Sequence, residues 1–182
     1  MHSPTPILPE LADETLAITP ELEEAQRARV VDEAKSWLGT PYRQLGASKG
    51  ASIDCAMLLV RCWVDAGVFK PFDPRPYPPE WHMHKSEERY LGWMEALACE
   101  VQTPRAGDIV LYRFGMCFSH GGVMISPTRL VHASAFELDC TFSDLTDVQL
   151  ARQRGRGGRT TPRPVKFFDV WAKVRQLQEG AA

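Results

Sequence analysis

The spacing of apolar residues along the chain changes at Pro104, and this change constrains the fold more than any other feature. Before it, apolar residues recur at helical spacing behind helix-capping residues. After it, short runs of branched and aromatic residues alternate with turn signals. Helices followed by strands are typical of an α+β domain whose helices pack on one side of an antiparallel sheet. We therefore expect the fold class α+β.

Capping and turn residues set the expected element boundaries. The expected helices are 20–38, capped by Thr19; 54 or 55 to 66, ended by Gly67; and one that follows Ser86 and includes 87–98. The expected strands are 109–113, 120–125, 129–134 and 165–171. The second helix is apolar almost all round, which predicts that it is packed on several sides and lies centrally. The Gly- and Ser-rich residues 39–54 are expected to form a loop.

A chain of 182 residues that is 44% apolar can bury one sizeable core, so a single domain is expected. Residues 1–18 are punctuated by prolines and are expected to be flexible. The domain then spans 19–176 and includes a Pro-rich insertion plus helix at 71–99 and a basic loop at 151–164, with 177–182 as a tail.

Charge and hydropathy exclude several partners. The net charge of −2 predicts no general attraction to nucleic acid or to a membrane surface. No apolar run reaches membrane-spanning length. The N-terminus has neither a basic n-region nor a continuous apolar stretch, so it is not a secretory signal and the chain is expected to be cytoplasmic as synthesised.

The cysteines and histidines do not form a metal-binding pattern. Five cysteines, at 55, 62, 99, 117 and 140, lack C-x-x-C spacing, which argues against a disulfide framework and a zinc site. His82 and His84 could join a zinc site only with further ligands, and none is evident. We expect them at the surface or at a cleft rim, and we expect no metal and no cofactor.

Cys55 follows a Gly/Ser-rich loop at the start of the central helix. The unpaired N–H groups and the positive end of the helix dipole favour the thiolate there, and they could also bind an oxyanion. The alternative is a thiol that only packs. Asp54 is expected to cap the helix.

Two histidines lie in neighbouring predicted strands. A hairpin turn at 126–128 places His120 opposite His132 or close to it, and opposed residues share a face of the sheet. One imidazole could act on Cys55 while the other orients it. The alternative, on which the residues alone do not decide, is that the two histidines are half-buried in their strands and share no role.

Five motifs occur in one order: WLGTPYR at 37–43, DCA at 54–56, PRAGDIVL at 104–111, SHGGV at 119–123 and LVHA at 130–133. In this respect the chain resembles the NlpC-type cysteine peptidases, bacterial cell-wall endopeptidases of the papain-like superfamily. The resemblance covers roughly residues 22–135. It implies a papain-like fold and a peptidoglycan stem peptide as substrate, cut between D-glutamate and a diamino acid without a metal.

The resemblance also assigns roles to residues. Cys55 matches the nucleophile, His120 the general base and acid, and His132 the residue that orients His120. Tyr42 matches a tyrosine whose hydroxyl lies near the thiol and helps to stabilise the oxyanion; the alternative is a Tyr packed under the loop. Asp108 is expected to stabilise a turn.

Some features depart from the family pattern or leave alternatives open. Ala56-Met57 replaces the small Ser-Gly pair of many relatives, and residues 71–99 lengthen the connection before the first strand. The segment around 76–91 resembles versions from phage tails and gene-transfer-agent particles, which would make particle proteins the partners and the cell wall the site of action after release. Another papain-like amidase or acyltransferase, and a catalytically silent tail subunit, are the alternative functions. Cys117 is the alternative nucleophile.

Overall fold

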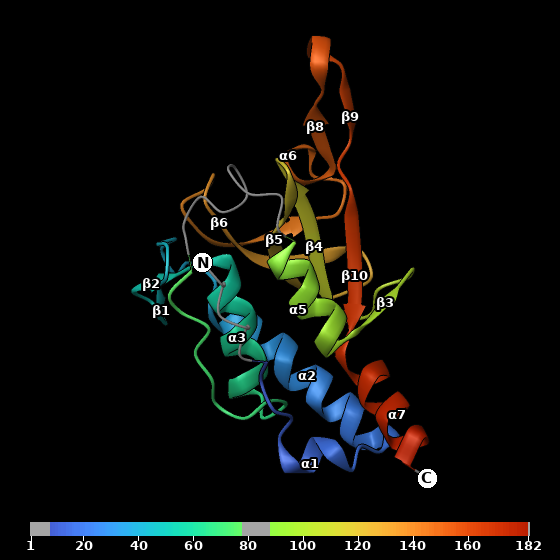
Figure 1. Ribbon diagram of the computed structural model, residues 1–182. Coiled ribbons are helices and arrows are strands. Elements are labelled where there is room, and N and C mark those ends of the chain that lie inside the picture. Colours follow the sequence, from blue (N-terminus) through green and yellow to red (C-terminus); the bar gives the residue numbers. More distant parts are fainter. Residues whose placement is uncertain (1–7, 78–87, 182) are drawn as a thin grey trace, which may run out of the picture.

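The computed structural model describes residues 8–77 and 88–181, and it shows helices packed against a sheet (Figure 1). Six antiparallel strands form that sheet in the order β3-β10-β4-β5-β6-β7. The strands are β3 (Cys99–Val101), β4 (Ile109–Phe114), β5 (Cys117–Met124), β6 (Arg129–Ser134), β7 (Asp139–Asp144) and β10 (Val165–Asp169). The helices are α1 (Asp13–Leu16), α2 (Pro20–Ser36), α3 (Cys55–Asp65), α5 (Arg89–Leu97), α6 (Val148–Ala151) and α7 (Val170–Ala181). The fold class α+β is confirmed.

The largest core lies between α3 and the sheet. Helix α3 packs on β5 and β6 and on α2, as expected of a helix that is apolar almost all round. Trp37, Trp63, Trp171 and Phe168 are almost completely buried there. The other face of the sheet carries a smaller cluster that α6 covers, formed by Val110, Tyr112, Met124, Leu130 and Leu150. Strand alternation therefore places apolar residues on both faces of β4.

A buried ion network joins α2 to one end of the β10–β4 pair, where β4 starts and β10 ends. Arg27 contacts Glu23 at 2.9 Å, Asp108 at 2.7 Å and Asp169 at 2.8 Å, and its guanidinium lies 4.3 Å from the Trp171 ring. Asp108 also accepts the Arg105 N–H, as expected of a turn residue. The network fixes the position of α2 relative to the start of β4.

Both ends of the chain differ from the expectation. Residues 8–18, predicted as a flexible segment, contain α1, in which the buried Thr15 donates to the Val68 carbonyl, and Leu11 bridges to Phe69. Within the predicted tail, residues 177–181 continue α7, which ends at Ala181. The last predicted strand ends at Asp169, whose carboxylate accepts the Ala172 N–H and starts α7.

Three stretches between the expected elements are more regular than expected. Residues 39–54 contain a small hairpin, β1 (Ala47–Ser48) with β2 (Ser52–Ile53). The basic segment 151–164 is also not an irregular loop: β8 (Arg152–Arg154) and β9 (Thr160–Pro162) pair around the short helix η1 (Arg156–Gly158). Strands β3 and β7 were not expected. The predicted cap Ser86 lies outside the described residues, and α5 begins at Arg89.

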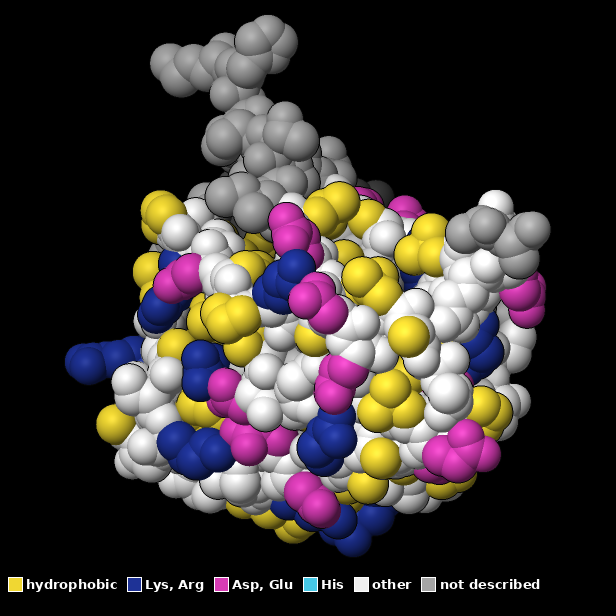
Figure 2. Space-filling view, turned by 90° about the horizontal axis from the view of Figure 1, so that it is seen from below, with side chains coloured by type: hydrophobic (Ala, Val, Ile, Leu, Met, Phe, Trp, Pro, Cys, Tyr) yellow, Lys and Arg dark blue, Asp and Glu magenta, His cyan; other side chains and the backbone are white. Residues whose placement is uncertain are grey.

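The lower face of the molecule in Figure 1, where α1, α2 and α7 lie, carries acidic and basic side chains interspersed (Figure 2). Such mixing leaves no large region of one sign on this face. Within the described residues, no helix combines the length and the apolar character that crossing a membrane requires.

Candidate active site

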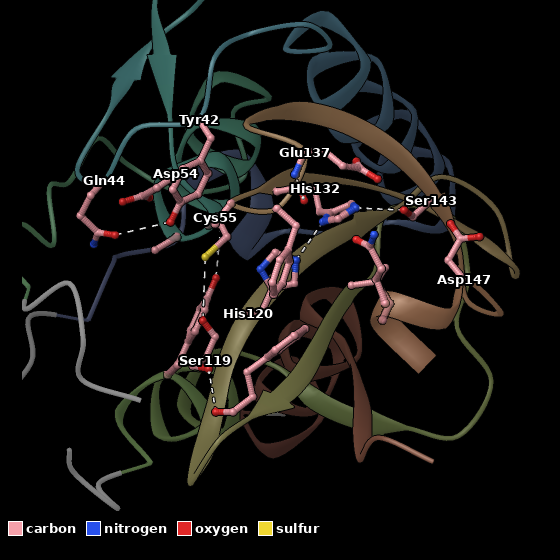
Figure 3. Close-up of a pocket in the computed structure, with 18 of the residues that line it drawn as sticks. Tyr42, Gln44, Asp54, Cys55, Ser119, His120, His132, Glu137, Ser143 and Asp147 are labelled. Atoms are coloured by element: carbon pink, nitrogen blue, oxygen red, sulfur yellow. Dashed lines mark hydrogen bonds between the residues drawn. The ribbon is translucent and has the colours of Figure 1, made fainter. Parts of the chain in front are cut away.

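The four predicted site residues lie in one cavity of about 410 Å³ beside the N-terminus of α3 (Figure 3). Cys55, His120, His132 and Tyr42 all line it. Its other lining residues include Gln44, Asp54, Tyr77, Tyr90, Phe114, Ser119, Phe136, Glu137, Ser143, Asp147 and Gln149. The cavity therefore brings together residues from the α3 start, from β5 to β7 and from the α6 segment.

The Asp54 cap holds the start of α3 in place. The Asp54 carboxylate accepts the Met57 N–H at 2.8 Å, as expected of an N-cap, and also the Leu45 N–H and the Tyr77 hydroxyl. Because the carboxylate is fully engaged, it fixes the first turn of the helix and thus the direction of the next side chain. Cys55 consequently lies at the cavity floor, partly exposed.

An irregularity in β5 turns a carbonyl toward the sulfur. The register between β4 and β5 shifts after the Tyr112–His120 pair, so that Arg113 pairs with Phe118 and Ser119 is left as an extra residue. The Ser119 carbonyl accepts the Cys55 thiol at 3.9 Å. Bulges often re-aim groups beside active sites, and this one places both Ser119 and His120 next to Cys55.

The two histidines are diagonal neighbours on one face of the sheet. Strand β5 pairs Val123 with Val131, which puts His132 opposite Gly122 and two residues from His120. Residues two apart share a face, and His120 Nε2 lies 2.9 Å from His132 Nδ1. In Figure 3, His120 lies between the Cys55 sulfur and His132. The expected proximity of the two rings is confirmed.

Ser143, which the sequence did not indicate as a site residue, continues the row of contacts from Cys55 through His120 to His132. His132 Nε2 lies 3.1 Å from the Ser143 hydroxyl of β7, and both side chains are buried. One set of tautomers satisfies both contacts while leaving a basic nitrogen toward the sulfur. His120 Nε2–H donates to His132 Nδ1, and His132 Nε2–H donates to Ser143. His120 Nδ1 is then free to accept the Cys55 proton.

Surrounding protein disfavours every charge at this site. Burial, and next the Asp54 carboxylate, raise the pKa of Cys55 to about 12, against a smaller opposing effect of nearby backbone N–H groups. Desolvation thus acts on Cys55 in the direction opposite to the expected effect of the helix terminus and favours the neutral thiol. Burial, with smaller effects of His132 and Arg163, holds the pKa of His120 well below its usual value. Burial also lowers the pKa of His132 to about 4.

Three tyrosines surround the Cys55 end of the cavity. The Tyr42 hydroxyl lies 3.5 Å from Gln44, and burial is the main cause of a raised pKa, so it is a neutral donor. Tyr77 contacts Asp54, and Tyr90 donates to the Cys55 carbonyl at 3.3 Å. Residues 71–77 and α5, which belong to the predicted insertion, thus contribute one wall of the cavity.

The competing residues do not reach the cavity. Cys117 is buried at the start of β5 and Cys62 lies in the main core, and neither lines the site. His82 and His84 lie outside the described residues. Over 8–77 and 88–181, no three His, Cys, Asp or Glu side chains are grouped so as to hold a metal ion.

Comparison with known proteins shows which sequences and folds this chain is similar to. The murein DD-endopeptidase MepS/murein LD-carboxypeptidase of Escherichia coli K12 is 32% identical over 108 residues, which are 59% of this chain and 50% of that protein. Among solved structures, NlpC2 from Trichomonas vaginalis superposes with a TM-score of 0.57 at 14% identity, covering 80% of this chain and 47% of that one. The peptidoglycan hydrolase RipB from Mycobacterium tuberculosis gives 0.55 at 18% identity, covering 93% and 73%.

The chain has the NlpC/P60 fold. No protein-family model matches it, and it spans about half the length of the curated relatives it matches. The predicted NlpC-type fold is thus confirmed. Within this NlpC/P60 fold, the cavity lies between the N-terminus of α3 and the strands β5 and β6.

Proposed function

We propose that the chain is a cysteine endopeptidase that hydrolyses an amide bond in the stem peptides of peptidoglycan. The observation that carries the proposal is the series Cys55–His120–His132 within one cavity, with the two imidazoles 2.9 Å apart. Nucleophile, base and orienting group in that order are what acyl transfer needs. The similarity to a murein endopeptidase supports the substrate class.

The geometry supports a proton transfer coupled to attack. Since burial favours the neutral form of both groups, His120 Nδ1 takes the thiol proton as the Cys55 sulfur bonds to the carbonyl carbon. The C–N bond then breaks and the imidazolium protonates the leaving amine, which leaves a thioester on Cys55. Water, activated by His120, hydrolyses the thioester and restores the thiol. Backbone N–H groups at the α3 start and the Tyr42 hydroxyl are the donors available to the oxyanion.

We propose the amide between D-glutamate and the diamino acid as the bond cut, although the E. coli relative is named for DD and LD activities. A digest of purified muropeptides, followed by mass spectrometry, identifies the bond. Fragments that end in D-glutamate support the proposal. Cleavage only at another amide would assign a different endopeptidase or amidase activity, and no cleavage by the wild type would favour the silent structural subunit.

We also propose that the protein acts as a component of a phage-tail-like particle that carries it to the wall. The segment around residues 76–91 motivates this setting. Immunogold labelling of purified particles from the producing cells tests it: labelled tail tips would support it, and labelling confined to cell lysate without particles would refute it.

A further inference from the structure

The hairpin β8–β9, with its connecting residues 155–159, forms an arm that projects from the sheet on the side away from α2 and α7 (Figure 1). None of its described residues is buried. Isolated two-stranded hairpins are marginally stable in water, and this arm adds nothing to either core. Its sequence is therefore better explained by contacts outside the chain than by folding.

Arg163 fixes the base of the arm to the rim of the cavity. Its guanidinium donates to the carbonyls of Leu150 at 2.9 Å and Arg152 at 2.8 Å, and lies 3.6 Å from the Phe114 ring centre. Leu150 and Phe114 line the cavity. The base of the arm thus adjoins the cavity wall, and the arm projects outward from it.

The arm is positively charged without compensation. Arg152, Arg154 and Arg159 are exposed, and none forms an ion pair with a carboxylate in the described part of the chain. No Asp or Glu occurs between Asp147 and Asp169. By contrast, the charged side chains that line the cavity itself are all acidic: Asp54, Glu137 and Asp147. A polyanionic ligand would be repelled at the cavity and attracted along the arm.

We propose that the arm binds carboxylates of polymeric peptidoglycan beside the stem peptide that occupies the cavity. The inference rests on the proposed function and deepens it, because it separates the polymer from soluble fragments as substrate. A cavity of about 410 Å³ accommodates only part of one stem peptide, whereas every stem of the polymer carries carboxylates. Arginine forks match carboxylate geometry, and repeated weak contacts add up along a polymer.

The test compares Arg154→Gln/Arg159→Gln with Lys35→Gln/Lys173→Gln, which removes the same charge from α2 and α7. In a Cys55→Ala background, co-sedimentation with sacculi free of teichoic acid measures binding. The arm variant should bind roughly tenfold more weakly at low salt, while the control stays within about twofold. Amidating the carboxylates of the sacculi should weaken binding of the unaltered arm to the same extent.

Turnover separates the two proposals. In the active background, the arm variant should digest sacculi several-fold more slowly and soluble muropeptides at the unaltered rate. Equal binding by both variants, or tight binding to amidated sacculi, would overturn the role of the arm. Binding to duplex DNA is measured with the same two variants, and an arm variant that lost DNA binding but kept sacculus binding would also overturn this role. Failure of the wild type to cleave soluble muropeptides would instead refute the proposed function, and the binding measurement would still decide on the arm.

Discussion

At Cys55, two physical effects of opposite sign act on one thiol. The helix N-terminus favours the thiolate, whereas burial and the neighbouring Asp54 disfavour it and together prevail. His120 is shifted in the complementary direction, toward the neutral base. Both shifts favour the neutral thiol and the neutral imidazole as the resting pair.

This resting state predicts slow alkylation at mildly acidic pH. A raised thiol pKa means that the thiolate fraction at pH 6 is minute and rises only in the alkaline range. Iodoacetamide should therefore modify Cys55 at pH 6 more slowly than it modifies a free thiol such as glutathione, with the rate rising steadily above pH 8. Peptide mapping by mass spectrometry gives the rate. Rapid modification at pH 6 would show a preformed thiolate–imidazolium pair.

Ser143 is expected to act as a positioning residue for His132. Ser143→Ala removes the hydrogen bond that selects the His132 tautomer, a loss of about 1–1.5 kcal/mol that should lower kcat/KM roughly five- to tenfold. Ser143→Thr should restore most of the activity. Nitrogen NMR of the imidazoles should show a changed tautomer ratio in Ser143→Ala alone. An unchanged spectrum with lowered activity would refute this role.

The candidate nucleophile and histidines could be predicted from their local setting, but their environment could not. The residues next to each of them in the sequence predict a capped helix start at Cys55 and two histidines in neighbouring strands. Desolvation at Cys55 depends on groups that are far apart in the sequence, which no spacing of motifs reports. Ser143 was missed because β7 reverses the usual pattern: Phe142 is exposed and Ser143 is buried.

At the scale of elements, the approach of α5 to β5 depends on Gly121. A Cβ atom there would lie 2.6 Å from the Tyr90 hydroxyl and 3.0 Å from the Leu59 side chain. Gly121→Ala should therefore destabilise the fold by about 1–3 kcal/mol and displace Tyr90 from the cavity wall. Urea unfolding followed by fluorescence measures the change.

Gly92 provides the matched control for this substitution. It lies exposed in α5 with open space around its Cα, so Gly92→Ala should stabilise the protein by about 0.5–1 kcal/mol. If both substitutions had the same effect, the close packing of α5 on β5 would be wrong.

Element types were easier to predict than register. Helical spacing and capping residues placed α2 and α3 within about a residue or two of their observed starts. The bulge at Ser119 and the diagonal placement of His120 and His132 follow from tertiary pairing of β4, β5 and β6. The basic hairpin was missed because its Gly- and Arg-rich strands lack any apolar alternation.

At the scale of the molecule, Arg27 links helix α2 to segments that are far apart in the sequence. It connects α2 with Asp108 before β4 and with Asp169 before α7. Arg27→Ala leaves the buried Asp108 carboxylate without a counter-ion, whereas Glu23 and Asp169 keep Arg175, and this loss should cost about 3–5 kcal/mol. The midpoint of urea unfolding should fall accordingly.

The exposed pair of Arg29 with Glu14 serves as control, since both side chains are about half exposed. Arg29→Ala should change the free energy of unfolding by less than about 1 kcal/mol. A similar loss in both variants would mean that the Arg27 network contributes no more than a surface ion pair.

The central claim is that the Cys55 sulfur attacks the amide carbonyl with His120 as its base. Acid-quenched reactions of the protein with muropeptides, mapped by mass spectrometry, test it most directly. We expect an acyl adduct on the peptide containing Cys55, and none in Cys55→Ala or on the other four cysteines. Turnover that leaves Cys55 unmodified, or that persists in Cys55→Ala, would contradict the account.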